Sequence, residues 1–285
     1  MNKKLILVLA GLGIALGAPI TASATPQDDL KQFQAYYKKR FPTVPLEAYK
    51  DGVNVLPQYA DQVENWRLLM EFPPYDEEVD KAEKLWNTPF ANGKTYASCF
   101  KNGAKGLAVG YPFYDTKSKQ VRTVVGDINE CRVRNGEKPI KNLKYGDMAR
   151  LAIAFKMRSN GKKMAVKIDS PGAIAAYEKG KQFYWARRGQ LNFSCAGCHV
   201  QNAGNTVRGN VLGAGLGHGV GFPVYRTKWA LKGKPLGTLH RRYGGCNKQV
   251  RAKPLKPQSD AYKNLELYEA YMNTGIPIEV PSQRM

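Results

Sequence analysis

Ser194-Cys195-Ala196-Gly197-Cys198-His199 is the stretch of sequence from which the fold is best inferred. Cys-x-x-Cys-His is typical of a c-type haem attachment site, because each thiol can bond one vinyl group of haem and the histidine can bind its iron. The motif therefore predicts one covalently bound haem c, held by Cys195 and Cys198, with His199 as an axial ligand. A thioredoxin-like pair needs no such histidine, and a structural zinc site needs more ligands nearby.

The start of the chain has the pattern of a secretory signal peptide, residues 1–24. Lys3 and Lys4 precede an apolar run, 5–16, and Ala22-Ser23-Ala24 is a small-residue cleavage site. The run is too short to span a bilayer, and no other stretch is long and apolar enough. We therefore expect a periplasmic protein, cleaved after Ala24 and without a membrane span, which agrees with haem attachment after export.

The composition is that of a basic globular protein. The chain has 285 residues, 43% of them hydrophobic, and a formal net charge of +21. This length suffices for one large domain or two small ones, and the charge favours acidic partners or anionic substrates. Nucleic acid is a frequent partner of such proteins, but an exported haem protein rarely meets it. We therefore expect no nucleic acid, and rather an acidic redox partner or a small anion.

The chain is organised as an N-terminal arm followed by an internal repeat. Residues 25–73 are expected to form the arm, with helices at 29–40 and 58–71, and a further helix follows at 74–88. In the repeat, Gly110-Tyr111-Pro112 corresponds to Gly221-Phe222-Pro223, and Cys131 corresponds to Cys246. A Lys-Pro pair begins seven residues after each of these two cysteines.

The predicted fold class is accordingly mainly α, with two cytochrome c-like domains at 74–165 and 166–285. The first copy has Phe100 after Cys99 and no second motif cysteine, so the N-terminal domain is expected to hold no haem. Cys99 and Cys131 take the positions of a haem-linking cysteine and of Cys246, which would face one pocket. A disulfide between Cys99 and Cys131 is expected in an oxidising compartment, with two buried free thiols as the alternative.

The second axial ligand of the iron has four candidates: His218, His240, Met272 and Cys246. Met272 lies in an amphipathic helix, 260–273, with Ser259 as its N-cap, and methionine in such a helix is usually core. Cys246 is the unpaired cysteine, and the repeat directs it toward the haem pocket. We therefore predict His199 and Cys246 as the axial ligands, with a buried spectator thiol as the alternative.

The sequence around Cys246 is rich in positive charge and poor in acids. The cationic residues are Arg241, Arg242, Lys248, Arg251 and Lys253. Such neighbours favour the thiolate and could hold a small dianion beside it, although a solvated basic face is equally consistent with them. Before them lies a glycine-rich loop, 202–220, which could approach a haem edge or a partner closely.

These motifs together resemble the SoxA family, the cytochrome subunits of L-cysteine S-thiosulfotransferase in periplasmic thiosulfate oxidation. The resemblance covers residues 74–281, and the stretches that carry it are 188–199, 222–226, 238–254, 265–268 and 275–279. It implies that Cys246 is the active-site cysteine, sometimes found as a persulfide, and that Arg242 is the active-site arginine. The chain lacks a first haem motif and so resembles the single-haem members.

The resemblance also implies a reaction and its partners. Thiosulfate is joined to a cysteine of a carrier protein, the SoxYZ complex, and two electrons are released. One iron accepts one electron at a time, so a second redox centre, the partner cytochrome SoxX, is expected. Two other hypotheses remain at this point: a simple periplasmic electron-transfer cytochrome c with Met272 or His218 as ligand, and an assembly subunit whose haem is structural.

Overall fold

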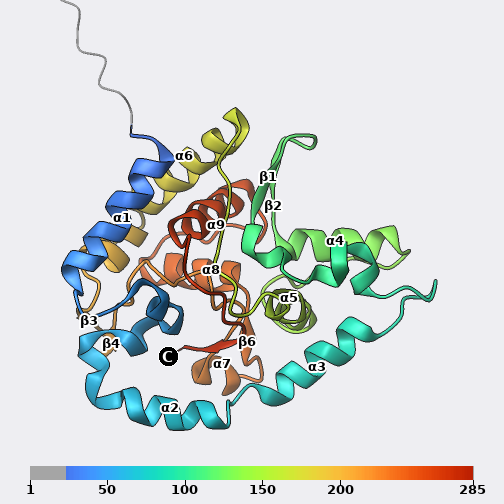
Figure 1. Ribbon diagram of the computed structural model, residues 1–285, viewed down its shortest axis with the longest axis horizontal. Coiled ribbons are helices and arrows are strands. Elements are labelled where there is room, and N and C mark those ends of the chain that lie inside the picture. Colours follow the sequence, from blue (N-terminus) through green and yellow to red (C-terminus); the bar gives the residue numbers. More distant parts are fainter. Residues whose placement is uncertain (1–23, 285) are drawn as a thin grey trace, which may run out of the picture.

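The computed structural model describes residues 24–284, so the predicted signal peptide lies outside the described residues except for Ala24. The described chain is mainly helical with a few short strands, as expected (Figure 1). Its α-helices are α1 (Pro26–Arg40), α2 (Val63–Glu71), α3 (Asp76–Asn87), α4 (Val124–Arg134), α5 (Asp147–Met157), α6 (Pro171–Trp185), α7 (Thr227–Ala230), α8 (Leu239–Gln249) and α9 (Asp260–Met272).

Shorter elements connect these helices. The 3-10 helices are η1 (Leu46–Val55), η2 (Pro57–Gln62), η3 (Tyr96–Cys99), η4 (Lys101–Ala104) and η5 (Leu107–Gly110), and η6 (Gly197–Gln201) is a π-helical turn. The strands are β1 (Phe113–Asp115), β2 (Gln120–Arg122), β3 (Thr206–Val207), β4 (Asn210–Val211), β5 (Val224–Tyr225), β6 (Leu236–Gly237) and β7 (Ser282–Gln283). β1 and β2 form one antiparallel pair and β3 and β4 another, while β5 lies between antiparallel β6 and parallel β7.

The N-terminal arm begins with a well-capped helix. The Thr25 side chain accepts a hydrogen bond from the Asp28 amide, and the Asp28 carboxylate accepts one from the Thr25 amide, which satisfies two amides at the start of α1. The expected single helix over 58–71 was wrong: η2 is a 3-10 helix, and α2 begins only at Val63 without a side-chain cap. Ser259 occupies the expected N-cap position of α9, but its side chain makes no capping bond.

The largest helix contact joins α6 and α9, which cross beside α8 in Figure 1. Gly180 permits this contact, because a Cβ atom there would lie 2.1 Å from the Asn264 carbonyl oxygen. Aromatic rings fill the seam: Tyr177 lies 5.3 Å and Tyr184 5.2 Å, centroid to centroid, from Tyr268. This aromatic seam fixes α9, which carries two of the carboxylates discussed below.

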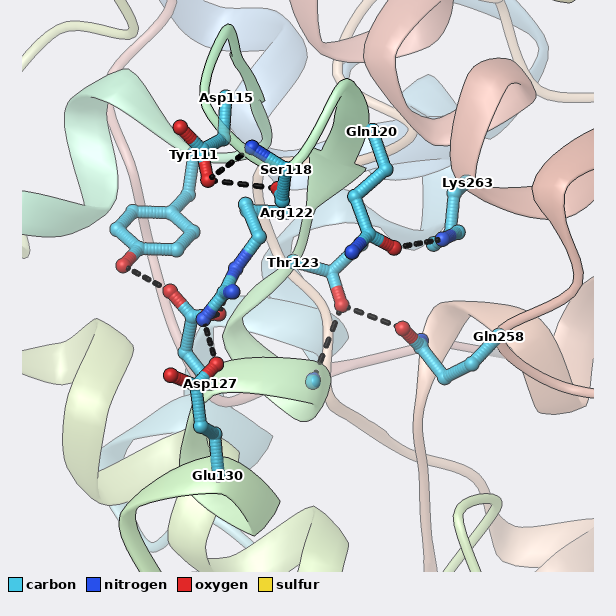
Figure 2. Close-up of polar contacts among 11 residues, drawn as sticks. Tyr111, Asp115, Ser118, Gln120, Arg122, Thr123, Asp127, Glu130, Gln258 and Lys263 are labelled. Carbon is cyan, nitrogen blue, oxygen red and sulfur yellow. Dashed lines mark hydrogen bonds and ion pairs between the residues drawn. The ribbon is translucent and has the colours of Figure 1, made fainter. Parts of the chain in front are cut away.

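A polar network connects the first part of the chain to the last (Figure 2). Thr123 caps α4 by accepting from the Gly126 amide, and its hydroxyl donates to the Gln258 side-chain oxygen at 2.6 Å. Asp127, in the first turn of α4, accepts from the Tyr111 hydroxyl and pairs with Arg122. The loop before α9 is thereby anchored to the N-terminal end of α4.

Within residues 24–284, no helix combines the length and the apolar character that crossing a membrane requires.

Candidate functional site

The segment 194–201 forms a tight turn that presents two thiols and an imidazole. Ser194 accepts a hydrogen bond from the Gly197 amide at 2.8 Å, and the chain then continues as the π-helical turn η6. Such π turns are uncommon and often occur at functional sites. Cys195 and Cys198 are free and half-buried, so both thiols remain available for bonding to a cofactor.

His199 is oriented by the glycine-rich loop. Its Nδ1 lies 2.9 Å from the Gly213 carbonyl oxygen, which can only accept, so Nδ1 carries the hydrogen and Nε2 keeps its lone pair. Loss of hydration lowers the pKa of His199 to about 4, and the charge of Arg242 adds to this effect. A neutral imidazole with a free Nε2 is the form that binds iron, and the backbone contact at Nδ1 is the usual arrangement around such a ligand.

The N-terminal arm holds this segment from behind. From α1, Tyr37 donates to the His199 carbonyl oxygen, Tyr36 donates to that of Val200 at 2.9 Å, and Arg40 donates to that of Ala203 at 3.0 Å. Sequence analysis assigned no chemical role to the arm, and these residues were missed. Their contacts join residues more than 160 positions apart, so no local pattern could have indicated them.

Cys246 and Arg242 lie one turn apart on α8 and therefore share a face of that helix. The charges of both residues affect the pKa of Cys198. Burial and then the negative charge of Cys246 raise this pKa, whereas the positive charge of Arg242 lowers it. Cys246 itself is free and half-buried. The structure thus places Cys246 and Arg242, the predicted active-site residues, close enough to the motif 195–199 to influence its thiols and imidazole.

The cations near Cys246 are only partly those that the sequence suggested. Lys248, Arg251 and Lys253 are exposed, whereas Arg241 stacks 3.9 Å from the Trp229 ring and donates to backbone carbonyls, so it supports the fold. Arg226 is the cation that the sequence did not suggest. Burial and then the charge of Arg242 lower the pKa of Arg226 to about 10, and Cys246 acts in the opposite direction.

Arg226 reaches this place through the three-stranded sheet. It directly follows β5, and Arg284 directly follows the parallel neighbour β7, with the Arg284 amide donating to the Tyr225 carbonyl oxygen at 2.9 Å. Burial lowers the pKa of Arg284 to about 10 as well. Since β5 and β7 are parallel, Arg226 and Arg284 leave the sheet at the same edge. α8 begins at the opposite edge, because it follows β6, which is antiparallel to β5.

The other three candidate ligands have different surroundings. The His218 ring centroid lies 4.0 Å from that of His199, so His218 belongs to the same site. His240 is buried, with Nδ1 accepting from the Gln258 amide at 2.9 Å and Nε2 lying 3.0 Å from a Glu266 oxygen. Met272 is 1% exposed within the core, as its position in an amphipathic helix suggested.

The disulfide between Cys99 and Cys131 is present, which confirms that prediction. The bond joins η3 to α4, and the Asn135 amide lies 3.3 Å from the Cys99 sulfur. Stacked aromatic rings lie next to it, with Trp86 at 5.7 Å from Tyr96 and 5.9 Å from Phe100. Side chains fill this part of the fold.

The helical fold, the thiol pair and the oriented imidazole define the class of protein, a c-type cytochrome. A family model described as "SoxA/TsdA, cytochrome c domain" matches residues 81–164, which indicates haem c as the cofactor. The chain is 45% identical over 280 residues to the L-cysteine S-thiosulfotransferase subunit SoxA of Allochromatium vinosum, covering 98% of this chain and 96% of that one. The SoxA subunit of Chlorobaculum tepidum is 43% identical over 280 residues, covering 98% and 95%.

A solved structure agrees with these relatives. The crystal structure of SoxXA from P. pantotrophus matches with a TM-score of 0.69 and 33% identity, covering 78% of this chain and 84% of that chain. The chain belongs to the SoxA family of L-cysteine S-thiosulfotransferase subunits.

Proposed function

We propose that this chain is the catalytic haem subunit of an L-cysteine S-thiosulfotransferase. It conjugates thiosulfate to a cysteine of a SoxYZ-type carrier protein and passes two electrons to a SoxX-type cytochrome. The observation that carries the proposal is the convergence of Cys246 and Arg242 from α8 with the motif 195–199. A thiol, a guanidinium and a cofactor-binding turn in one place suit sulfur chemistry on an anion better than electron transfer alone.

The residues present fit one haem c. Cys195 and Cys198 are free thiols on one turn, His199 is neutral with Nε2 available, and Cys246 supplies a sulfur ligand. Haem would supply a one-electron acceptor and an iron that favours the thiolate form of Cys246. In this proposal Cys195 and Cys198 would bond the haem covalently, and His199 and Cys246 would bind its iron.

The chain's own residues have distinct roles in the reaction. Joining a thiol to thiosulfate forms one sulfur–sulfur bond and releases one proton and two electrons. Cys246, as thiolate or persulfide, is the sulfur at which thiosulfate reacts, and Arg242 binds the dianion beside it through charge-assisted hydrogen bonds. Because one iron takes one electron at a time, the second electron requires the partner cytochrome.

We also propose that the chain consists of two related cytochrome c-like halves, 74–165 and 166–285, and that the first holds no haem. Two observations support this. α4 and α8 each contain 11 residues, each follows a threonine, and each has its cysteine, Cys131 or Cys246, as its eighth residue. The place that corresponds to haem in the first half contains the disulfide and stacked aromatic rings.

The setting of the reaction is likewise part of the proposal. The predicted signal peptide and covalent haem favour export to the periplasm. A periplasmic location also suits the Cys99–Cys131 disulfide, because such bonds persist in oxidising compartments.

Replacing Cys246 tests the function directly. Cys246→Ser should abolish conjugation of thiosulfate to the carrier and change the haem absorption spectrum, because the ligand and the reacting sulfur are lost together. Gln249→Ala, at an exposed position on the same helix, is the matched control and should leave both unchanged. Normal turnover by Cys246→Ser would refute the proposal.

The contact between His218 and His199 favours one alternative, a simple electron-transfer cytochrome with His218 as the second ligand. His218→Ala separates the two cases. It should leave the absorption spectrum of the wild type intact if sulfur binds the iron, and should change that spectrum if the alternative is correct. If Met272 were the second ligand instead, the oxidised protein would show the absorption band that is typical of methionine ligation.

A further inference from the structure

Glu269 is a buried carboxylate on α9 that the proposed reaction does not use. Its residue is 5% exposed, and one of its oxygens accepts a hydrogen bond from the Tyr243 hydroxyl of α8 at 2.5 Å. In the part of the chain that the structure describes, Glu269 forms no ion pair, and the only charged neighbour acting on it is Glu266, one turn earlier. A carboxylate that lacks a cation in such a place is costly to keep ionised.

Two further groups face Glu269 from the elements packed against α9, and one of them belongs to the haem motif. Tyr184 of α6 is one of them, and its hydroxyl is buried without a hydrogen-bond partner among the described residues. Cys195 is another: burial and then the negative charge of Glu269 raise the pKa of this thiol to about 12. Glu269 therefore acts electrically on the residue that is expected to carry the haem.

Cations do not offset this charge at Glu269. Arg188 lies on the side of Cys195, with Nη1 3.6 Å from its sulfur, and acts there against Glu269. The charged residue that α1 contributes to this region is Asp29. Its carboxylate forms an ion pair with the ammonium group of Lys181 in α6 at 2.6 Å. Thus the local field around Glu269 remains negative.

A small cavity lies beside Glu266 of the same helix. Glu266 lies against His240 and lines a cavity of about 30 Å³, whose other lining residues include Lys156, Gln258 and Leu239. Much of the cavity lining is apolar, but the cavity is large enough for a water molecule, and the side chains of Lys156, Gln258 and Glu266 offer it polar partners. His240, which lines the cavity, stacks 5.5 Å from the Tyr243 ring, and the Tyr243 hydroxyl bonds Glu269.

We propose that Glu269 is a redox-linked proton acceptor for the cofactor bound at Cys195 and Cys198. When a haem bound there would accept one electron, the Glu269 carboxylate takes up one proton from the bulk solvent. The net charge of the buried region is then the same before and after the electron arrives. No bond to the iron changes in this step, and the inference depends on the proposed function only in requiring haem at these two cysteines.

The burial of Glu269 supports this role. Burial raises the pKa of Glu269 to about 7, with Glu266 adding to the effect and the Tyr243 hydrogen bond opposing it. A further negative charge nearby raises the pKa again, so near neutral pH the carboxyl changes its protonation with the redox state. Uptake of the proton lowers the cost of holding an added electron in a buried place.

The midpoint potential of the holoprotein in complex with its partner, measured between about pH 5 and pH 9, tests the proposal. In the wild type the midpoint potential of the haem should fall as the pH rises around neutrality. The slope should approach about 59 mV per pH unit, which corresponds to a tenfold change in the equilibrium constant of a one-electron reduction. Glu269→Gln should flatten this dependence. Glu266→Gln is the matched control on the same helix. Its potential should show the same slope over a lower pH range, because the charge that helps to raise the pKa of Glu269 is removed.

Two results overturn the proposal: a potential in the wild type that does not change with pH, or a Glu269→Gln variant that keeps the wild-type slope. If Glu269→Gln fails to fold, redox-difference infrared spectroscopy of the wild type decides instead. Reduction should produce a carbonyl band of a protonated carboxyl group, and Tyr243→Phe should shift that band, because its hydrogen-bond donor is lost. The absence of a band, or an unshifted one, refutes the assignment to Glu269.

Failure of this inference differs from failure of the proposed function. A protein without a c-type haem spectrum refutes the function before any potential is measured. A normal haem protein that conjugates thiosulfate, but whose potential is independent of pH, refutes only the role of Glu269.

Discussion

Tyr37 bonds the backbone on both sides of the haem site: its hydroxyl donates to the His199 carbonyl oxygen and accepts from the Gly215 amide at 2.8 Å. The residue is fully buried, and the two backbone groups that it bonds are also joined to each other, with the Gly215 amide donating to the His199 carbonyl oxygen at 2.9 Å. One phenol from the N-terminal arm therefore fixes both the turn that carries the imidazole and the loop that orients it.

Replacing Tyr37 by phenylalanine should destabilise the fold by about 1–2 kcal/mol, because two buried hydrogen bonds are lost while the Gly215 amide still donates to the His199 carbonyl oxygen. The midpoint of chemical unfolding measures this change. Tyr36→Phe is the matched control: it also loses a bond to a backbone carbonyl, but its side chain is 36% exposed, so we expect a loss below about 1 kcal/mol. Equal effects of the two substitutions would contradict the account.

Gly217 tests the packing of the glycine-rich loop. Its φ is +81°, and a Cβ atom would lie 1.8 Å from the Tyr49 carbonyl oxygen. Gly217→Ala should therefore cost more than the roughly 1–2 kcal/mol of left-handed backbone strain alone. Gly209→Ala is the control, with φ +75° and nothing within 4 Å of the added Cβ atom. The prediction is wrong if thermal unfolding shows the two variants to be equally stable.

The Cys99–Cys131 disulfide should contribute about 3–4 kcal/mol to stability in the loop-entropy model. Its cysteines are 32 positions apart, which is the loop that the bond closes. Replacing both by serine should lower the unfolding midpoint and leave haem absorption unchanged, because the bond lies in the other half of the chain. An unchanged midpoint would show that the bond adds nothing.

The stability of the protein should depend on pH through Glu269. Its pKa of about 7 in the folded chain exceeds the ordinary value of 4.5, so between these values the folded state holds a proton that the unfolded state has released. Folding stability is then lost as the pH rises through this window, by about 3 kcal/mol in full. Chemical unfolding at about pH 5 and pH 8 should show that Glu269→Gln, compared with the wild type, lacks this loss. If wild type and variant keep the same stability difference at both pH values, the carboxyl does not titrate as described.

Arg242 should act on substrate. Arg242→Gln should lower kcat/KM for thiosulfate by roughly 10- to 100-fold, because one charge-assisted hydrogen bond contributes about 1.5–3 kcal/mol. Lys248→Gln removes one positive charge from an exposed position on the same helix and should change kcat/KM by less than about twofold. Comparable losses in both variants would indicate a general field effect and exclude a specific contact.

The sequence predicted what local spacing encodes. The motif 195–199, the cysteine pair Cys99–Cys131 and the mainly helical fold follow from short patterns and from cysteine positions. The structure confirms the disulfide and the helical fold, and the haem ligands remain a prediction. It could not predict Arg226 as a neighbour of Cys246, because the parallel pairing of β5 with β7 positions that side chain. The split of 58–71 into η2 and α2 was also missed, since apolar periodicity does not distinguish a 3-10 turn from an α-helical one.

The four hydrogen bonds from α1 to the segment 199–203 all end on main-chain carbonyl oxygens. The arm therefore recognises the course of the backbone and is indifferent to the identity of the side chains there. Over evolutionary time Gln201 and Asn202 are free to be exchanged as far as the arm is concerned, while Tyr37 and Arg40 are not. Sequence drift should accordingly be asymmetric, with the distant N-terminal residues more constrained than those beside the imidazole.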